Sequence, residues 1–379
     1  MTTRVALLGA GKIGDAIVNL LGGCGDYALT VADRDLARLD AVGRQHAKGM
    51  AARRGPLTLK RAEIAEPKAL ADVVAGHDVV ISASPYFLTP VIAAAAKSAG
   101  AHYFDLTEDV SSTRAVKALA DDAVTAMVPQ CGLAPGFVSI VAADLARRFD
   151  RLRDVEMRVG ALPIYPTNAL KYNLTWSTDG LINEYCNACE AIVDGALHEA
   201  PALEGVEALS LDGVGYEAFN TSGGLGTLCE TLAGRVENLN YKTVRYPGHR
   251  DLMKLLVRDL RLGQRRDVLK DVLETAVPMT LQDVVLVFVT VSGWREGRLT
   301  QETYAHKVYG RELGGERLSA IQLTTASGIC AMVDLVVQGK LAQRGFVRQE
   351  DARLADFLDN RFGRYYRETR HEPAEAMPA

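Results

Sequence analysis

The stretch VALLGAGKIG, residues 5–14, joins a short apolar run to a glycine-rich turn and then to a helical pattern. Its glycines have the spacing G-x-G-x-x-G, which is typical of a turn that binds the pyrophosphate of a dinucleotide. Gly9 permits the tight turn, Gly11 lets the backbone approach the phosphates, and Gly14 lets the helix lie close to the preceding strand. The free N–H groups and the positive end of this helix would then face the anion.

The next apolar run supports this interpretation. The segment ALTVA, residues 28–32, is followed by Asp33. An acid at the end of the second strand of such a unit accepts hydrogen bonds from the hydroxyls of an adenosine ribose. Because Asp33 would repel a 2′-phosphate, we expect NAD before NADP. Arg34 leaves NADP open, since a guanidinium beside the pocket can pair with a phosphate or stack on adenine.

Length and composition limit the class of protein. The chain has 379 residues, of which 48% are hydrophobic and 24% charged, with a net charge of -4. This length predicts two domains, and the slightly acidic balance argues against a nucleic-acid binder. We see no apolar stretch long enough to span a bilayer and no signal-peptide pattern, so we expect no membrane partner and a cytoplasmic location.

The six cysteines are consistent with that compartment. Only Cys186 and Cys189 form a C-x-x-C pair, without a second pair or nearby histidines. We therefore expect free thiols, with this pair on a helix, and no metal site.

The alternation of elements predicts an α/β fold in three parts. In residues 1–137, strands alternate with helices, which is typical of a Rossmann-type, doubly wound parallel sheet that binds a dinucleotide. Residues 138–322 contain longer strands, including a hairpin over 284–308, and predict an α+β substrate-binding and dimerisation domain with a mixed or antiparallel sheet. Residues 323–379 predict C-terminal helices that pack back on the first domain, and then a disordered tail. Individual helices are expected at 178–193, 251–262, 324–337 and 348–366.

Three strand ends of the first domain are candidate site segments, because ligands bind at the carboxyl ends of parallel strands. They contain Ser84 and Pro85, Asp105 and Glu108, and the run CGLAPG that begins at Cys131. An ordinary Gly/Pro exit turn is an equal alternative for the last segment.

The second domain offers further polar groups. Asp179 follows a Trp-Ser-Thr segment and either contacts a ligand or only stabilises a helix start. The loop that begins with Asn220 and Thr221 either holds a carboxylate or is a plain loop. On a strand through residues 241–246, Arg245 and Lys242 point to opposite faces. An inward Arg245 would bind a carboxylate with two hydrogen bonds.

With these segments the chain resembles the saccharopine dehydrogenase-like family, and most closely its lysine 6-dehydrogenase branch. The resemblance covers nearly the full length. It rests on GAGKIG (9–14), CGLAPG (131–136), NTSGG (220–224) and KTVRYPGH (242–249), of which the last three are the more specific. It implies oxidation at a C–N bond of an amino acid. Asp179 stands where L-glutamate-forming saccharopine dehydrogenases carry an arginine for a carboxylate, which favours free lysine as substrate.

The resemblance assigns provisional roles. For L-lysine, hydride transfer from the 6-carbon gives an imine, which water hydrolyses to the semialdehyde and ammonia. The expected catalytic acids and bases are Asp105 and Glu108, with His102 as an alternative base. The expected substrate-binding residues are Tyr172 and Asp179 for the amine, and Asn220, Thr221 and Arg245 for the α-carboxylate. The expected cofactor-binding residues are Gly9, Gly11, Lys12, Ile13, Gly14, Asp33, Arg34, Ser84, Pro85 and Cys131.

Three functions remain in competition. The first is a lysine 6-dehydrogenase. The second is a saccharopine dehydrogenase (L-glutamate-forming) or a related enzyme of the carboxynorspermidine or homospermidine type, which condenses its substrates reductively. The third is a non-catalytic dinucleotide-binding regulator. The large second-domain sheet predicts a homodimer or a higher homo-oligomer.

Overall fold

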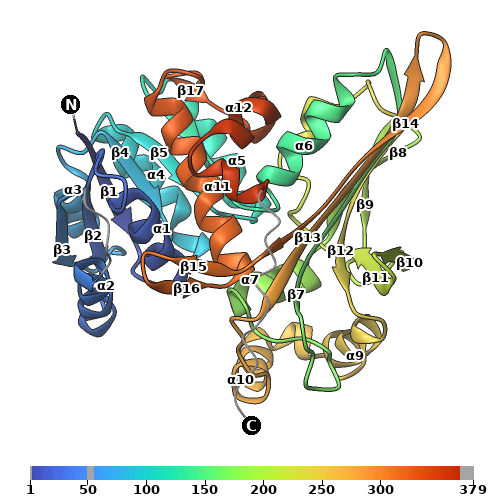
Figure 1. The fold of residues 1–379 in the computed structure, drawn as a ribbon, viewed down its shortest axis with the longest axis horizontal. Helices are drawn as coiled ribbons and strands as arrows, with labels where there is room; N and C mark the ends of the chain where they lie inside the picture. Colours follow the sequence, from blue (N-terminus) through green and yellow to red (C-terminus); the bar gives the residue numbers. More distant parts are fainter. Residues whose placement is uncertain (1, 49–54, 368–379) are drawn as a thin grey trace.

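The computed structural model describes residues 2–48 and 55–367, and the predicted disordered tail lies outside them. Two sheets organise the described residues, with a layer of helices between them (Figure 1). All strands of the first sheet are parallel. Their order in space is β17 (Gly345–Phe346), β6 (Ala126–Val128), β5 (His102–Asp105), β4 (Val79–Ser82), β1 (Thr3–Leu8), β2 (Tyr27–Asp33) and β3 (Leu57–Arg61).

Helices cover both faces of this sheet. Alternation along β1 explains why, since Val5 and Leu7 pack into one apolar cluster and Ala6 and Leu8 into the other. The first cluster includes α1 (Lys12–Gly22) and α2 (Leu36–Lys48), and the second includes α3 (Pro67–Val74), α4 (Thr89–Ser98) and α5 (Val110–Ala120). The predicted doubly wound α/β sheet is therefore confirmed.

The second sheet is mixed. Its central strand β7 (Arg151–Pro163) runs parallel to β12 (Asn238–Arg245) and antiparallel to β13 (Asp283–Arg295). The other strands are β8 (Cys189–Val193), β9 (Ala196–Ala200), β10 (Glu207–Leu211), β11 (Val214–Asn220) and β14 (Arg298–Tyr309). The predicted hairpin is β13 and β14. A separate pair consists of β15 (Arg311–Leu313) and β16 (Glu316–Leu318).

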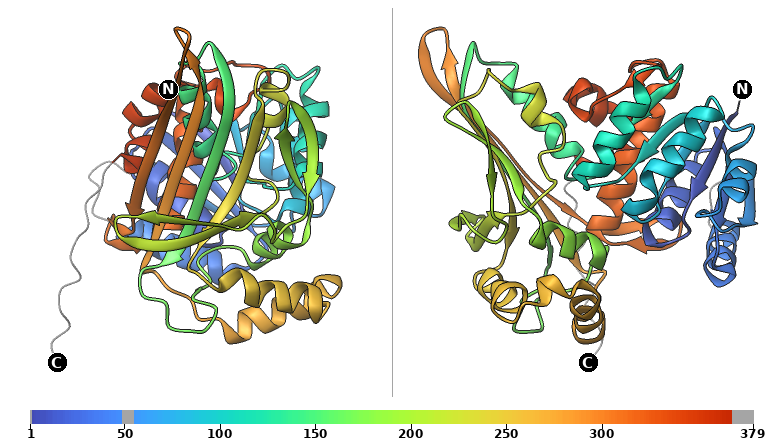
Figure 2. Two further views of the ribbon diagram at one scale, coloured as in Figure 1. Left: turned by 90° about the vertical axis from the view of Figure 1, so that its right-hand side faces the viewer. Right: turned by 180° about the vertical axis from the view of Figure 1, so that it is seen from behind.

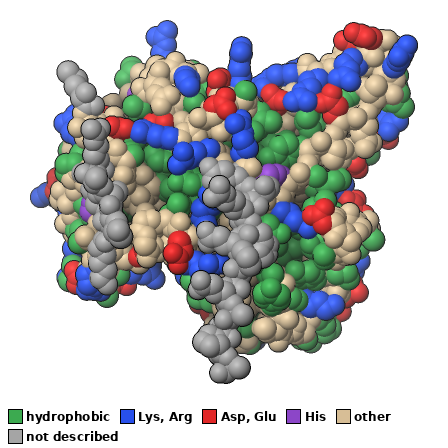
Figure 3. All heavy atoms as spheres, viewed as in Figure 1, with side chains coloured by type: hydrophobic (Ala, Val, Ile, Leu, Met, Phe, Trp, Pro, Cys, Tyr) green, Lys and Arg blue, Asp and Glu red, His purple; other side chains and the backbone are tan. Residues whose placement is uncertain are grey.

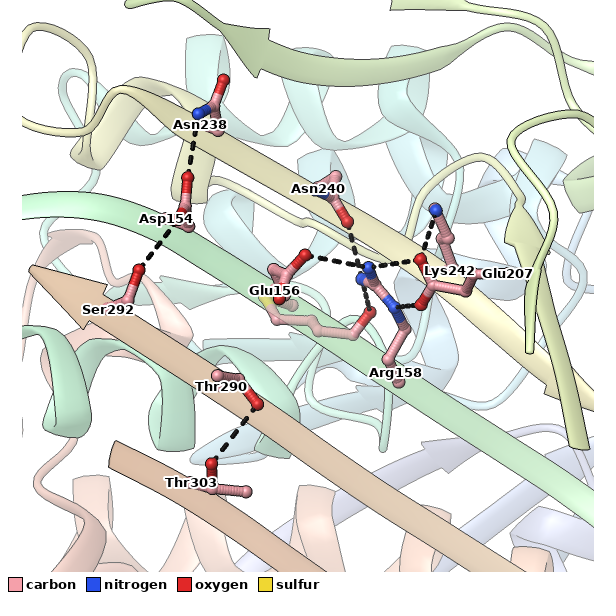
Figure 4. A network of polar contacts seen from close by, with 11 residues as sticks. Asp154, Glu156, Arg158, Glu207, Asn238, Asn240, Lys242, Thr290, Ser292 and Thr303 are labelled. Atoms are coloured by element: carbon pink, nitrogen blue, oxygen red, sulfur yellow. Dashed lines mark hydrogen bonds and ion pairs between the residues drawn. The ribbon is translucent and has the colours of Figure 1, made fainter. Parts of the chain in front are cut away.

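The two faces of the second sheet have different roles. The inner face packs against α6 (Phe137–Ala146) through residues such as Val155 and Met157. The outer face is turned away from the first domain (Figure 2, left) and carries a network of buried and half-buried polar groups. There Arg158 binds Glu207 and Asn240 across the strands (Figure 4). The functional cleft must therefore lie on the inner face.

Two predicted helices of the second domain were too long. The helix predicted at 178–193 ends at Cys186 as α7 (Thr178–Cys186), and residues 189–193 form β8. Cys189 thus lies on a strand, so the prediction of a helical C-x-x-C was wrong, although all six cysteines are free thiols. Pairing of β8 with β9 overrides the helical pattern. The helix predicted at 251–262 is α9 (His249–Lys254) with one π-turn over Leu255–Asp259.

Further helices flank the second sheet. They are α8 (Leu228–Thr231) and α10 (Arg266–Ala276).

Ion pairs lie at the surface near the β13–β14 turn. Arg148 and Arg295 pair there with Glu302, and Figure 3 shows basic side chains beside acidic ones at this end of the molecule.

The C-terminal part returns to the first domain. Helix α11 (Ala320–Val337) starts four residues before the predicted start, is preceded by a capping box at Ser319, and packs on α1. Its Asp334 accepts hydrogen bonds from Tyr27 of β2 at 2.7 Å and from Asn360 at 2.8 Å. The single helix predicted at 348–366 is broken into α12 (Leu354–Asp359) between two short 3-10 turns, and β17 was not predicted.

One expectation about apolar stretches was wrong. Ala320–Val337 has the length and hydropathy of a membrane-spanning helix, but 89% of this stretch is buried inside the protein. In this structure α11 is a buried core helix, and its apolar side chains pack in one cluster with residues of the first domain and of the C-terminal segment.

Candidate functional site

A cavity of about 930 Å³ lies between the carboxyl ends of the first sheet and the inner face of the second. It brings together nine of the residues predicted for the site. These are Gly11, Lys12, Ile13, Ser84, Pro85, Asp105, Glu108, Asp179 and Arg245. The other predicted residues lie behind its walls or outside it.

The glycine turn has the geometry that dinucleotide binding requires. A Cβ on Gly14 would lie 2.0 Å from the carbonyl oxygen of Gly9, so helix and strand approach too closely for any side chain. Gly9 has a φ of +112°. By contrast, a Cβ on Gly11 would meet no protein atom within 4 Å. That open space beside the cavity is where a pyrophosphate fits at the start of α1.

Gly11→Ala provides a clean test of this site. Gly11 has a φ of -75° and faces open space, so we expect the melting temperature to stay within about 2 °C of the wild type. The added methyl group occupies the space for the phosphates, so the Kd for NADH or NADPH should rise at least about tenfold. Differential scanning fluorimetry and fluorescence titration measure the two effects. Unchanged dinucleotide affinity would contradict the assignment.

The predicted ribose contact lies at the edge of this region. The carboxylate of Asp33 accepts the N–H of Ala10 at 2.8 Å and that of Asp35 at 2.9 Å, which holds it at the end of β2. Neither Asp33 nor Arg34 is among the residues that line the cavity, and Arg34 is exposed. Arg38, the third residue of α2, does line it.

A buried hydroxyl in the cavity fits a bound ligand. Ser82 Oγ is buried and has no hydrogen-bond partner within the described residues. Buried polar groups in native proteins are normally paired, so this hydroxyl is suited to bind a ligand or water. Ser84 differs, because its hydroxyl donates to the carbonyl of Leu8 at 3.0 Å and fixes the loop after β4.

Cys131 does not contact the cavity. Its thiol is fully buried, lies 3.2 Å from Gln349 Nε2 and donates to the carbonyl of Val128. The residues after it, Gly132 to Pro135, form the wall instead. The prediction of Cys131 as a cofactor ligand was wrong, because the segment reaches the cavity only from the next residue, Gly132, onward.

Asp105 is the acid nearest the strand ends. It is 1% exposed, and its Oδ1 accepts the N–H groups of Thr107 and Gln130, both at 2.9 Å. Burial raises the pKa of this carboxyl to about 6, and the two N–H groups oppose that rise. Asp105 therefore ionises near neutral pH.

Two glutamates share the cavity with Asp105. Burial raises the pKa of Glu108 to about 7, and nearby acids add to this effect. Glu184, on α7, is 6% exposed, and burial raises its pKa to about 8 although the charge of Arg245 opposes the change. Carboxyls that titrate near pH 7 are suited to proton transfer at neutral pH.

The raised pKa of Glu184 makes stability depend on pH. A carboxyl with a higher pKa in the folded state loses its stabilising contribution as pH rises from about 4.5 towards about 8. Glu184→Gln removes this loss. The melting temperature of the variant minus that of the wild type should therefore be larger at pH 9 than at pH 5, by about 4 °C or more. The exposed Glu199→Gln is the control. An equal difference at both pH values would show that Glu184 does not titrate in this range.

Arg245 comes from β12 and points to the inner face, as the alternation predicts, while Lys242 pairs with Glu207 on the outer face. The guanidinium is 3% exposed and lies over the ring of Tyr172, 5.0 Å from its centre. Its Nε donates to the hydroxyl of Tyr185 at 3.0 Å and its Nη1 to the carbonyl of Val244 at 2.8 Å. Such a fixed, buried cation can bind a carboxylate.

Two predicted amine ligands have other roles in the structure. Tyr172 is 1% exposed and does not line the cavity; its hydroxyl accepts the indole N–H of Trp176 at 3.2 Å. Asp179 lies at the rim, exposed, and pairs with Lys270 at 2.6 Å. The sequence does not show that α10 brings Lys270 to this position.

The loop of Asn220 and Thr221 does not reach the cavity. It lies behind Glu108, since a Cβ on Gly223 would be 2.4 Å from the Glu108 carbonyl oxygen. Similarly, a Cβ on Gly224 would be 2.3 Å from the ring of Tyr241. The small residues therefore permit close packing against the site, and the prediction that this loop binds a carboxylate was wrong.

His102 is also excluded as a base. It stands at the start of β5, at the opposite end of the sheet from the cavity, and its Nδ1 accepts the N–H of Ala126 at 3.0 Å. Burial lowers its pKa.

Several cavity residues were missed from the sequence. They are Glu184, Tyr241, Thr243, Trp176 and Arg38. A signal existed for Glu184, because it interrupts the buried face of α7 between Ile182 and Tyr185. A charged residue on a buried helix face is costly unless it is paired, hydrogen-bonded or neutralised, so its presence there indicates a functional or paired site.

Two family models together match almost the whole chain. The saccharopine dehydrogenase NADP binding domain matches residues 5–129, and the saccharopine dehydrogenase C-terminal domain matches residues 132–361. The chain therefore belongs to the saccharopine dehydrogenase family.

Curated relatives agree with this assignment. The chain is 27% identical over 206 residues to saccharopine dehydrogenase (NADP+, L-glutamate-forming) of Saccharomyces cerevisiae, which covers 52% of this chain and 44% of the relative. It is 21% identical over 324 residues to the mitochondrial alpha-aminoadipic semialdehyde synthase of Bos taurus, which covers 81% of this chain and 33% of the relative. The matches thus span less than half the length of these relatives.

A solved structure shares the fold. The apo saccharopine dehydrogenase (L-Glu forming) of Saccharomyces cerevisiae superposes with a TM-score of 0.70 over 92% of this chain and 94% of that one, at 17% identity. The overall fold is therefore common to both proteins.

Proposed function

We propose that the chain is a nicotinamide-dependent oxidoreductase that acts on a CH–NH bond of an amino acid. One observation carries the proposal. The buried Arg245 faces the same cavity as the glycine turn of α1 and the acids Glu108 and Glu184. The arrangement provides for a dinucleotide, a carboxylate and proton transfer from an amine.

L-lysine is the first candidate substrate. Arg245 holds its α-carboxylate, and Glu184 and Glu108 lie near its amines. An ε-ammonium has an ordinary pKa of about 10.4, so it must lose a proton before oxidation, and Glu108 accepts that proton. A bound nicotinamide supplies the acceptor for the hydride. Asp105 then takes a proton from the water that attacks the imine, Glu108 returns its proton to the departing nitrogen, and the products are the semialdehyde and ammonia.

Saccharopine is the second candidate. The activity of the yeast relative, a saccharopine dehydrogenase (NADP+, L-glutamate-forming), supports it. The pairing of Asp179 with Lys270 also supports it, because the neutralised pair at the rim no longer repels a second carboxylate. This observation weakens the argument for lysine that rests on Asp179 alone.

The choice between NAD and NADP has support on both sides. Asp33 at the end of β2 favours NAD. The description of the family model and the position of Arg38 in the cavity wall favour NADP. The ratio of the two dissociation constants decides between them.

The test is an absorbance assay for reduced cofactor at alkaline pH, with NAD or NADP and either L-lysine or L-saccharopine. A signal with lysine supports deamination, and a signal only with saccharopine supports the second candidate. If neither is oxidised although the dinucleotide binds tightly, the protein is a regulator or acts on another amine.

We also propose a homodimer formed through the outer face of the second sheet. This broad face combines polar groups such as Glu207 and Lys242 (Figure 4) with the partly exposed apolar side chains of Leu209 and Tyr246. Sedimentation equilibrium tests the proposal, and a mass of one chain at micromolar concentration contradicts it.

A further inference from the structure

A chain of three hydrogen bonds lies behind Arg245. Arg245 Nε is 3.0 Å from the hydroxyl of Tyr185, that hydroxyl is 3.0 Å from His249 Nε2, and His249 Nδ1 is 2.8 Å from the carbonyl oxygen of Leu170. Tyr185 and His249 are fully buried and do not line the cavity. They come from α7 and α9, two helices that are far apart in the sequence.

Each hydrogen bond in this chain has only one possible direction. The carbonyl of Leu170 can only accept, so the proton of His249 is on Nδ1. Burial and the charge of Arg245 lower the pKa of His249 to about 3, so the ring is neutral and Nε2 is an acceptor. The hydroxyl of Tyr185 therefore donates to His249, and its oxygen is left to accept the Nε–H of Arg245.

These contacts fix the plane of the guanidinium. Nε is bound to Tyr185, Nη1 to the carbonyl of Val244, and the ring of Tyr172 covers one face. Within the part of the chain that the structure describes, no residue accepts a hydrogen bond from Nη2. Since Arg245 lines the cavity, its Nη edge remains for a ligand.

We propose that Tyr185 and His249 are positioning residues that orient Arg245 so that its Nη edge receives the carboxylate of the substrate. The inference rests on the proposed function, because it assigns Arg245 to that carboxylate. Phenylalanine would fill the position of Tyr185 equally well in the surrounding apolar cluster. The hydroxyl is needed only for the bonds to Arg245 and His249.

The first test compares Tyr185→Phe with the wild type on L-lysine and on 1,5-diaminopentane, which lacks the carboxylate. For lysine we expect KM to rise at least about tenfold, with kcat changed less than about threefold. For the diamine we expect no change in kcat/KM. His249→Leu should behave like Tyr185→Phe, and His249→Gln, whose amide can both accept and donate, should restore part of the affinity.

Phe219→Leu is the matched control. The centre of the Phe219 ring lies 5.9 Å from that of Tyr185 and 6.3 Å from that of His249. Phe219 has no polar side-chain atom and so takes no part in the hydrogen bonds. This variant loses packing and should keep the KM for lysine. An equal loss with both substrates in Tyr185→Phe, or the same rise of KM in Phe219→Leu, would overturn the inference.

A second measurement does not depend on the substrate. In protein labelled with ¹⁵N-arginine, the Nε–H of Arg245, identified by its absence in Arg245→Lys, should exchange slowly in the wild type and in Phe219→Leu. It should exchange fast in Tyr185→Phe. If lysine, the diamine and saccharopine are all left unoxidised but this pattern is found, the proposed function fails and the positioning of Arg245 stands. Slow exchange in Tyr185→Phe would refute the positioning role.

Discussion

Arg245→Gln should lower kcat/KM for the amino-acid substrate by roughly 30- to 1,000-fold, which corresponds to about 2–4 kcal/mol for a lost pair of charge-assisted hydrogen bonds. Most of the loss should be in KM, because the carboxylate is distant from the bond that is oxidised. Arg245→Lys should recover little of it, since an ammonium cannot reproduce the planar pair of donors. Steady-state kinetics with saturating dinucleotide measures both variants.

Arg158→Gln is the matched control for this loss. Arg158 is equally buried, lies on the adjacent strand β7 and is held by Glu207 and Asn240, but it is on the outer face of the sheet (Figure 4). The control should lower the melting temperature and leave kcat/KM unchanged. If both arginine variants lose activity equally, Arg245 stabilises the sheet and does not bind substrate.

Glu108→Gln should lower kcat about 100- to 10,000-fold, the usual contribution of a general base. In the wild type the base acts only when ionised, so kcat should rise with pH and level off above a midpoint near the raised pKa of about 7. The variant should lose this rising limb. Rates measured from pH 5.5 to pH 9.5, with dinucleotide and substrate saturating, give both quantities.

Glu350→Gln is the corresponding control. Glu350 is 2% exposed and burial raises its pKa, but it is bound to Thr227 and Thr231 outside the cavity. Its replacement should leave the pH profile unchanged. A rising limb that persists in Glu108→Gln and disappears in Glu184→Gln would transfer the role of base to Glu184.

The sequence was sufficient where local pattern determines structure. The glycine turn, the parallel sheet and the β13–β14 hairpin follow from spacing and periodicity within one or two elements. The inward direction of Arg245 follows from the alternation along one strand. Four of the strand-end residues, Ser84, Pro85, Asp105 and Glu108, line the cavity because parallel strands end at one edge.

Sequence reasoning failed where the outcome depends on contacts between distant segments. Asp179 could be identified as a helix-start acid, but its partner Lys270 is 91 residues away. Tyr172 was assigned to the amine. The sequence could not show that the guanidinium of Arg245 lies over its ring, because that is a contact between distant segments. The two-residue strand β17 carries too short a pattern to recognise and exists only because β6 pairs with it.

The return of the C-terminal segment to the first sheet affects the order in which the protein can be completed. During synthesis, β1 to β6 leave the ribosome long before α11 and β17, which cover α1 and extend the edge at β6. Asp334 of α11 also provides the buried partner of Tyr27 in β2. The first domain therefore cannot be completed until the C-terminal segment has emerged, although most of its sequence comes first, and the second sheet lies within the chain as an insertion between its parts.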